Sequence, residues 1–211
     1  MSERLEQAGR RFARLVTRAV VARPWLWRLF RPLMRVQFNS LARVWDERRG
    51  PEALLPLEVA FDRLDGEPTQ VLDLGTGTGK AARAAAARFL RAEVVGVDLS
   101  PAMIEEARRL APSNLAERVR FEVADASTLP FEDGAFDLVI LLNMIPFFDE
   151  LGRVAGPRAS VVFAYFAGAE TPIYTPPATL RERLEPLGFD QFEEIAAGVG
   201  TALLARRGTR S

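Results

Sequence analysis

The 211-residue chain contains no cysteine and no histidine, and only one of its 28 basic residues, Lys80, is a lysine. These absences exclude disulfides, zinc fingers, thiol nucleophiles and every catalytic triad that uses an imidazole. Proton transfer at an active site would fall to Asp, Glu, Tyr or this single lysine. The sequence therefore predicts no metal site, and we assign no catalytic base.

Long apolar runs are also missing. The longest stretches without a charged residue have 11 residues, at 138–148, 159–169 and 195–205. A membrane-spanning helix needs about 18–20 apolar residues, so we expect no transmembrane segment. Arginines between positions 10 and 23 interrupt any apolar core of a secretory signal, and we therefore expect a cytoplasmic protein.

Charge divides the chain into two regions whose charges cancel. Residues 1–50 have a net charge of +8 and residues 51–211 a net charge of −8. Spacings of three and four predict an amphipathic helix in the first region, with an apolar stripe of Leu5, Ala8, Phe12, Leu15 and Ala19. Two further helices are expected at 33–46 and 51–64. We predict a basic helical region at 1–66, followed by a domain at 67–211.

Short apolar strands alternate with helices in the second region, which predicts an α/β fold with a parallel sheet covered on both faces. Strands are expected at 71–74, 93–98, 120–124, 136–142 and 160–166, and helices at 80–91, 101–110 and 177–187. Two last strands, at 191–196 and 201–205, are too close for a crossover and should form an antiparallel hairpin. The result is a seven-stranded mixed sheet.

A glycine-rich loop follows the first of these strands. Its sequence is Asp73-x-Gly75-x-Gly77-x-Gly79. Such a loop lets a ligand approach the backbone and the free N–H groups of the next helix. A phosphate-binding P-loop would need Gly at position 74 and Ser or Thr at position 81, where Leu and Ala stand. A dinucleotide fingerprint fails at its sixth position, which is Lys80.

The loop resembles motif I of the class I S-adenosylmethionine-dependent methyltransferases, and further motifs of this family follow in order. An acid ends the second strand at Asp98, an Asp125-Ala126 pair follows the third strand, and residues 134–143 resemble motif IV. The resemblance covers about residues 65–207. It implies a Rossmann-like methyltransferase fold, S-adenosylmethionine as the cofactor, and transfer of its methyl group.

The resemblance also implies a set of cofactor contacts. An acid at the place of Asp98 accepts the ribose hydroxyls in this family, and one at the place of Asp125 accepts the adenine amine. The residues implied in cofactor binding are Asp73, Gly75, Thr76, Gly77, Gly79, Asp98, Leu99, Met103, Asp125, Ala126 and Asn143. For Met103 an ordinary place in the core is an equal alternative.

Residues 143–150 follow the fourth strand, where the family places the acceptor. Two residues separate Asn143 from Pro146, so the Asn-Pro-Pro-aromatic motif of nucleobase amino-methylases is absent. The apolar character of this stretch predicts a small, apolar or aromatic acceptor. Trp45, Pro146 and Phe147 are the candidate acceptor contacts, although a packing role for Phe147 is equally open.

The basic N-terminal region has three interpretations: a nucleic-acid arm, a membrane-surface helix that inserts Trp25, Trp27 and Phe30, or a helical cap over the cofactor. Residues 38–46 resemble a segment that precedes motif I in small-molecule and quinone methyltransferases of the family. We therefore favour the cap, with peripheral membrane contact second and nucleic acid disfavoured. An RNA or protein methyltransferase, and a non-catalytic cofactor-binding protein, are the alternative functions.

Overall fold

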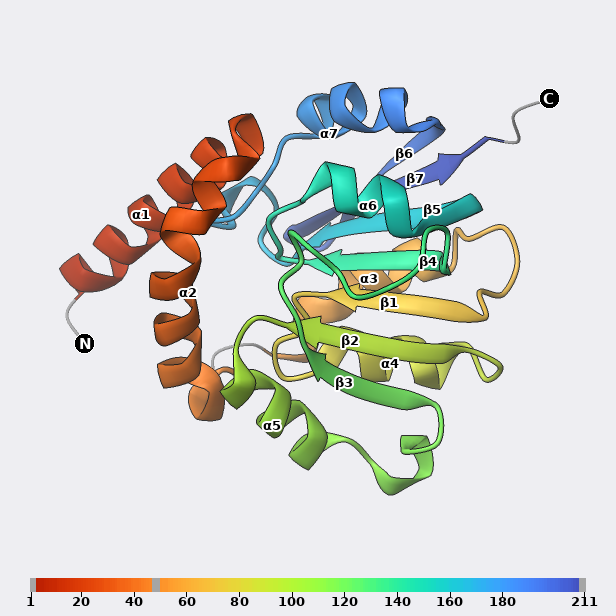
Figure 1. Cartoon of the computed structure of the whole chain (residues 1–211), viewed down its shortest axis with the longest axis horizontal. Coiled ribbons are helices and arrows are strands. Elements are labelled where there is room, and N and C mark those ends of the chain that lie inside the picture. Colours follow the sequence, from red (N-terminus) through yellow and green to blue (C-terminus); the bar gives the residue numbers. More distant parts are fainter. Residues whose placement is uncertain (1–2, 47–49, 209–211) are drawn as a thin grey trace.

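The computed structural model describes residues 3–46 and 50–208, which fold around one central sheet (Figure 1). Its strand order is β3-β2-β1-β4-β5-β7-β6, and β7 runs antiparallel to both of its neighbours. The strands are β1 (Gln70–Leu74), β2 (Glu93–Asp98), β3 (Val119–Val123), β4 (Phe136–Leu142), β5 (Ala155–Tyr165), β6 (Phe189–Ala197) and β7 (Gly200–Arg207). The expected seven-stranded mixed sheet with a terminal antiparallel hairpin is thus confirmed.

Helices cover both faces of this sheet. They are α1 (Glu3–Ala22), α2 (Trp27–Leu41), α3 (Leu55–Phe61), α4 (Lys80–Arg88), α5 (Pro101–Leu110), α6 (Phe148–Val154) and α7 (Pro177–Leu184). Because side chains alternate along a strand, Val71 packs with α3, α4 and α5, whereas Leu72 and Leu74 pack with α6 and α7. Two apolar layers therefore enclose the sheet.

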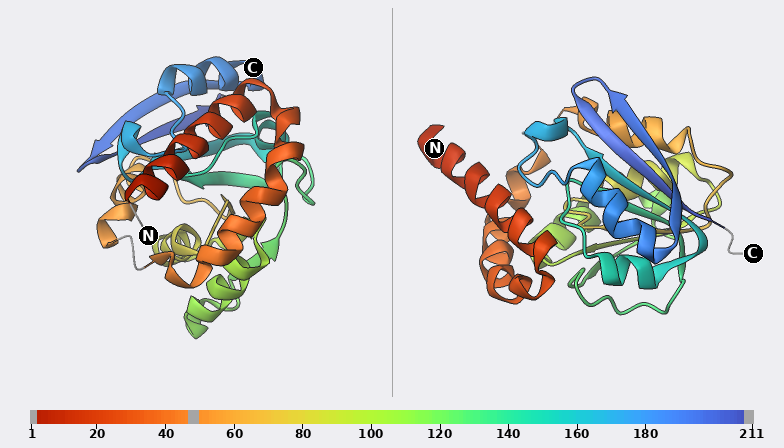
Figure 2. Two further views of the ribbon diagram at one scale, coloured as in Figure 1. Left: turned by 90° about the vertical axis from the view of Figure 1, so that its left-hand side faces the viewer. Right: turned by 90° about the horizontal axis from the view of Figure 1, so that it is seen from above.

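The helices α1 and α2, called here the N-terminal helix pair, form a V beyond the carboxyl ends of the parallel strands (Figure 2). Val16, Val20, Trp27 and Met34 from this pair belong to the same buried cluster as the α6–α7 side of the sheet. Ligands of open α/β sheets bind outside the carboxyl ends of the strands, so the helix pair lies over that position. None of the helices within the described ranges has the length and apolar character that crossing a bilayer requires.

Three local expectations were wrong. The apolar side of α1 is rotated: Leu15 is exposed while Val16 and Val20 are buried, and the side chains of Leu5 and Ala8 lie outside the described residues. The second helix begins at Trp27 instead of residue 33, because Pro32 is accommodated on its exposed side. The short helix α6 was missed.

Candidate functional site

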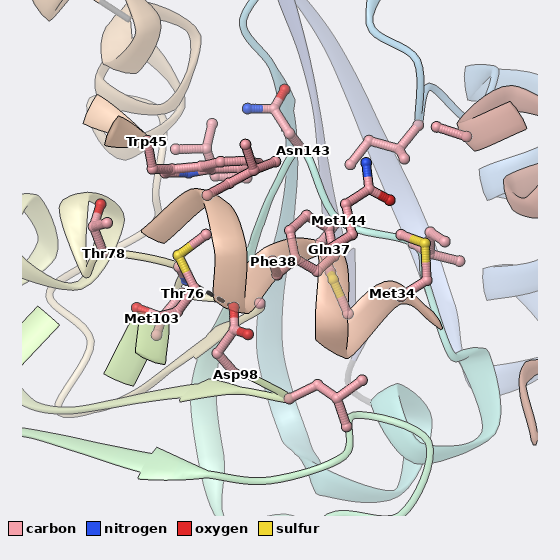
Figure 3. A pocket seen from close by; sticks show the side chains of 18 of the residues that line it. Met34, Gln37, Phe38, Trp45, Thr76, Thr78, Asp98, Met103, Asn143 and Met144 are labelled. Atoms are coloured by element: carbon pink, nitrogen blue, oxygen red, sulfur yellow. Dashed lines mark hydrogen bonds between the residues drawn. The ribbon is translucent and has the colours of Figure 1, made fainter. Parts of the chain in front are cut away.

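A cavity of about 930 Å³ lies between the carboxyl ends of the strands and the N-terminal helix pair (Figure 3). Loops after β1, β2 and β4 form one side, and inward-facing residues of α2 form the other. This volume is at the upper end of the range of about 300–1,000 Å³ for small-molecule sites. The cavity can therefore hold a cofactor and a small second ligand.

The glycine loop between β1 and α4 forms part of the wall. Gly75, Gly77 and Gly79 all have positive φ angles, of 69°, 55° and 82°. A Cβ atom at Gly77 would lie 3.4 Å from the indole nitrogen of Trp45, and one at Gly79 only 2.7 Å from the ring of Phe121. Gly77 therefore keeps the cavity side of the loop open, while Gly79 lets the loop pack against the core.

Asp73 organises this loop from below. Its Oδ2 accepts hydrogen bonds from the Thr76 hydroxyl (2.6 Å) and from the Ala82 N–H (3.0 Å). Burial raises the pKa of Asp73 to about 6. Among the described residues its Oδ1 has no hydrogen-bond partner although it is buried, so the floor of the site holds an acceptor that a ligand N–H group would satisfy.

Asp98 ends β2 and lies in the cavity wall. Its Oδ2 accepts the Gly77 N–H at 3.0 Å, and its Oδ1 accepts the Ser100 N–H at 2.8 Å. Burial raises the pKa of Asp98, and these two backbone donors oppose the rise. Each oxygen keeps a second lone pair, so the carboxylate can still accept two hydroxyl groups.

Asp125 follows β3, but its carboxylate is turned toward α2. It accepts hydrogen bonds from the indole N–H of Trp27 (2.9 Å) and from Arg31 (3.1 Å), as well as from Ser127. Although partial burial raises the pKa of Asp125, the bonds from Ser127, Trp27 and Arg31 outweigh it and lower the pKa. Asp125 does not line the cavity, whereas Ala126 does. A contact of Asp125 with adenine stays a prediction.

Four other residues that the sequence implied in binding line the cavity. They are Leu99, Met103, Asn143 and Trp45. Asn143 has a φ of +52°, and its Oδ1 accepts the Phe166 N–H at 3.1 Å. The chain turns there, so the cavity wall continues with Met144 and Ile145.

Pro146 and Phe147, the candidate acceptor contacts, lie beyond this wall. Both are buried, and the Phe147 ring packs edge-on against Trp27 at 5.3 Å between ring centroids. Their proposed contact with an acceptor therefore stays a prediction, and the structure itself gives Phe147 a packing contact with the helix pair.

Sequence reasoning missed the side of the site that α2 contributes. The cavity is also lined by Met34, Gln37, Phe38 and Leu41 of α2, and by Thr171 and Ile173 from the segment after β5. The spacing of Trp27, Met34, Phe38 and Leu41 follows one helical face, which is the signal that could have found them.

Polar contacts of two residues, Asn39 and Asp46, attach the N-terminal segment to the loops of the site. The Thr78 hydroxyl of the glycine loop donates to Asp46 at 2.7 Å, and Lys80 lies 3.7 Å from the same carboxylate. The Ser100 hydroxyl, at the start of α5, donates to Asn39 at 2.6 Å. Residues 39 and 46 thus bind the loops that follow β1 and β2.

Comparison with known proteins agrees with this geometry. A family model described as a methyltransferase domain matches residues 71–157. The malonyl-[acyl-carrier protein] O-methyltransferase of Halorhodospira halophila is 39% identical over 154 residues, 67% of this chain and 50% of that protein. A demethylmenaquinone methyltransferase of Thermus thermophilus is 44% identical over 110 residues, 49% of this chain and 50% of that protein. The chain spans about half the length of both relatives.

Solved structures share the fold. A SAM dependent methyltransferase from Aquifex aeolicus superposes with a TM-score of 0.60 at 20% identity, covering 80% of this chain and 97% of that one. A [4+2]-cyclase superposes with a TM-score of 0.57 at 22% identity, covering 71% and 78% of the two chains. These two likenesses show the fold alone, which does not fix the reaction. The sequence matches and the glycine loop agree with each other: residues 71–157 match a methyltransferase domain, and the relatives that the chain resembles are named methyltransferases.

Proposed function

We propose that this chain binds S-adenosylmethionine and transfers its methyl group to a small acceptor. The observation that carries the proposal is the pairing of Gly77 with Asp98: an open loop and a carboxylate with free lone pairs meet at one wall of the cavity. The bound cofactor supplies a methyl group on a positively charged sulfur, which is already activated for displacement. Residues 75–79, Asp98, Leu99, Met103 and Ala126 would hold it.

The rest of the cavity supports a small, apolar or aromatic acceptor. Its walls include Met34, Phe38, Met144 and Ile173 (Figure 3 labels the first three), with Gln37 as a polar group among them. The names of the relatives include a malonyl-acyl-carrier-protein and a demethylmenaquinone acceptor, which supports a small molecule without choosing one. The N-terminal helix pair would act as the cap that holds this acceptor, whereas α3, also within the predicted region 1–66, packs on the sheet.

The carboxylates in the described lining are Asp46, Asp73 and Asp98, and each of them already accepts a hydrogen bond from the protein. Asp73 and Asp98 accept backbone N–H groups, and Asp46 accepts the Thr78 hydroxyl. We infer that the protein contributes position and exclusion of water, so the acceptor supplies its own nucleophilicity, as an acidic phenol or enol does.

The helix pair encloses the acceptor side of the cavity, which favours a small molecule over RNA or a protein. Besides this acceptor, we infer contact of the N-terminal region with a membrane surface. A cytoplasmic location stays a prediction, and cell fractionation with an antibody to the full chain would check it.

Calorimetry tests the cofactor part of the proposal. S-adenosylmethionine and S-adenosylhomocysteine should bind, and NAD and ATP should not. Asp98→Ala should weaken cofactor binding by about 1.5–3 kcal/mol, the scale of a hydrogen bond to a charged group. Asp149→Ala removes an exposed carboxylate of α6 outside the cavity and should bind as the parent does. If the parent and Asp98→Ala bind the cofactor with equal affinity, Asp98 does not bind the ribose hydroxyls.

Transfer of a labelled methyl group tests the reaction. The full chain should label a component of a lipid and quinone extract and leave total RNA unlabelled. Cofactor binding without any labelled product would favour the non-catalytic alternative, and labelled RNA would favour the nucleic-acid alternative.

A further inference from the structure

The outer side of the N-terminal helix pair carries an apolar stripe that no described part of the protein covers. Its members are Trp25, Leu29, Leu33 and Val36, with exposed fractions of 61%, 67%, 53% and 64%. They begin in the single turn η1 (Pro24–Leu26) and continue along α2 at spacings of four, four and three. This spacing keeps them on one helical face, which we call the outer stripe.

The outer stripe is separate from the face of α2 that builds the cavity. Trp27 and Met34 are buried, and both line the cavity with Phe38. The helix is therefore apolar on two sides, and only one of them has a partner within residues 3–46 and 50–208. Single exposed apolar residues are ordinary on a protein surface, whereas a contiguous stripe marks an interaction site.

Positive charge flanks the outer stripe, and negative charge is missing. Residues 7–45 contain no Asp or Glu. Arg23, Arg28 and Arg35 are exposed, and within residues 3–46 and 50–208 none of them has a carboxylate within 4.0 Å. Arg14 and Arg31 instead point to the protein body, where they pair with Glu170 and Asp125. Arg28 and Arg35 directly precede Leu29 and Val36 on α2, and thus lie beside the outer stripe.

We propose that the outer stripe docks on an anionic lipid surface. Apolar side chains including a tryptophan would enter the boundary between headgroups and acyl chains, and the flanking arginines would reach the lipid phosphates. A second copy of the chain would bring two arginine-rich faces together. The phosphate backbone of a nucleic-acid duplex would contact the arginines, but it offers no apolar surface for Leu29, Leu33 and Val36.

This assignment changes which residues contact the lipid. The membrane interpretation of the sequence named Trp25, Trp27 and Phe30. Trp27 is only 5% exposed and bonds to Asp125, and Phe30 packs on Phe12 with 6.3 Å between ring centroids. Only Trp25 of the three belongs to the outer stripe. The cap and the membrane surface are therefore two faces of one helix, and they do not exclude each other.

Docking by this face would place the cavity directly behind the lipid surface, because α2 separates the two. This deepens the proposed function by naming a bilayer as the place from which an apolar acceptor enters. Lipid binding itself needs neither cofactor nor acceptor. An assay without them separates failure of this proposal from failure of the proposed methyl transfer.

Co-sedimentation of the full chain with vesicles tests the proposal. The chain should bind vesicles of phosphatidylcholine and phosphatidylglycerol in equal parts, and bind vesicles of phosphatidylcholine alone far more weakly. Leu29→Ser/Leu33→Ser/Val36→Ser should weaken binding at least about tenfold. The matched control Leu90→Ser/Val123→Ser/Val199→Ser changes three exposed apolar residues outside the helix pair and should bind as the parent does.

Arg28→Gln/Arg35→Gln tests the charge. Each basic residue near an anionic surface strengthens binding about fivefold, so this variant should bind about twenty-five-fold more weakly. Raised salt should weaken binding of the parent in the same direction. A blue shift of tryptophan emission on vesicle binding should disappear in Trp25→Phe and persist in Trp45→Phe. All substituted side chains except Trp45 are exposed, and thermal melts would verify folding.

Four results would overturn the proposal. They are a parent that stays in solution with anionic vesicles, a parent that binds both kinds of vesicle equally, an outer-stripe variant that binds as the parent does, and a control variant that loses as much. Sedimentation velocity adds a fifth: a parent dimer that the outer-stripe variant converts to a monomer would assign the face to a second copy.

Discussion

Asp73 lies near the end of β1, and its raised pKa gives the stability of the protein a specific pH dependence. The folded value of about 6 lies above the ordinary value of 3.8, so the folded state holds the proton more tightly than the unfolded state. The stabilisation that protonated Asp73 gives the folded state is complete below pH 3.8, and it is lost as the pH rises through 6. As the pH rises from 3.8 to 6, the ionisation of Asp73 lowers the free energy of unfolding by about 3 kcal/mol in total.

Asp73→Asn should remove this contribution. The difference in unfolding free energy between parent and variant should fall from pH 4 to pH 6 and stay constant above pH 7. Urea titrations at these pH values measure it. A difference that does not change with pH would show that the pKa of Asp73 is the same in the folded and unfolded states.

Gly77 permits a second prediction at the scale of one residue. Gly77→Ala places a Cβ at a φ of +55°, which costs about 1–2 kcal/mol of stability, and points it at Trp45 across the cavity. Gly66→Ala has the same kind of strain at a φ of +99°, with no atom within 4 Å of the new Cβ. Both variants should lose similar stability in thermal melts, and only Gly77→Ala should lose cofactor affinity in calorimetry. If Gly77→Ala and Gly66→Ala bind the cofactor with equal affinity, Gly77 does not contact the cofactor.

At the scale of elements, the N-terminal helix pair depends on a carboxylate of the sheet domain. Trp27→Phe keeps an aromatic ring against Phe147 and removes the N–H that bonds to Asp125. A hydrogen bond to a charged acceptor is worth about 1.5–3 kcal/mol. We expect hydrogen exchange in α2 to become faster by a corresponding factor, while exchange in β1 and β4 stays unchanged. Unchanged exchange in α2 would mean that packing alone holds the helix.

The elements also show what the sequence could predict. Strands β1, β2 and β4 and the loops between them follow local patterns, and their positions were predicted within a residue. The two partners of Asp125 on α2 lie 94 and 98 residues away along the chain, and no local pattern connects them with Asp125. The rotation of α1 was missed because Leu15 and Val16 are both apolar, and only tertiary packing decides which is buried.

For the whole molecule, removal of residues 1–36 tests the division into cap and sheet domain. The sheet keeps both of its apolar layers, so the truncated chain should remain folded. Loss of Val16, Val20, Trp27 and Met34 from the α6–α7 layer should lower its melting temperature and expose apolar surface. Cofactor binding should persist, because Asp98 and the glycine loop remain, and methyl transfer should fall sharply. Calorimetry measures cofactor binding, and the labelled-methyl assay measures methyl transfer. Full turnover by the truncated chain would contradict a role as cap.

The contacts of Asn39 with Ser100 and of Asp46 with Thr78 have a thermodynamic consequence. The loops after β1 and β2 bind the N-terminal segment in the free protein and are also the loops proposed to bind the cofactor. A ligand that tightens these loops changes the free energy with which the helix pair binds to them. By linkage, a change in the helix pair alters the affinity for that ligand by the same factor. Whatever a lipid surface does to cofactor affinity, the cofactor must do to lipid affinity. Two independent titrations would thus have to return one coupling constant.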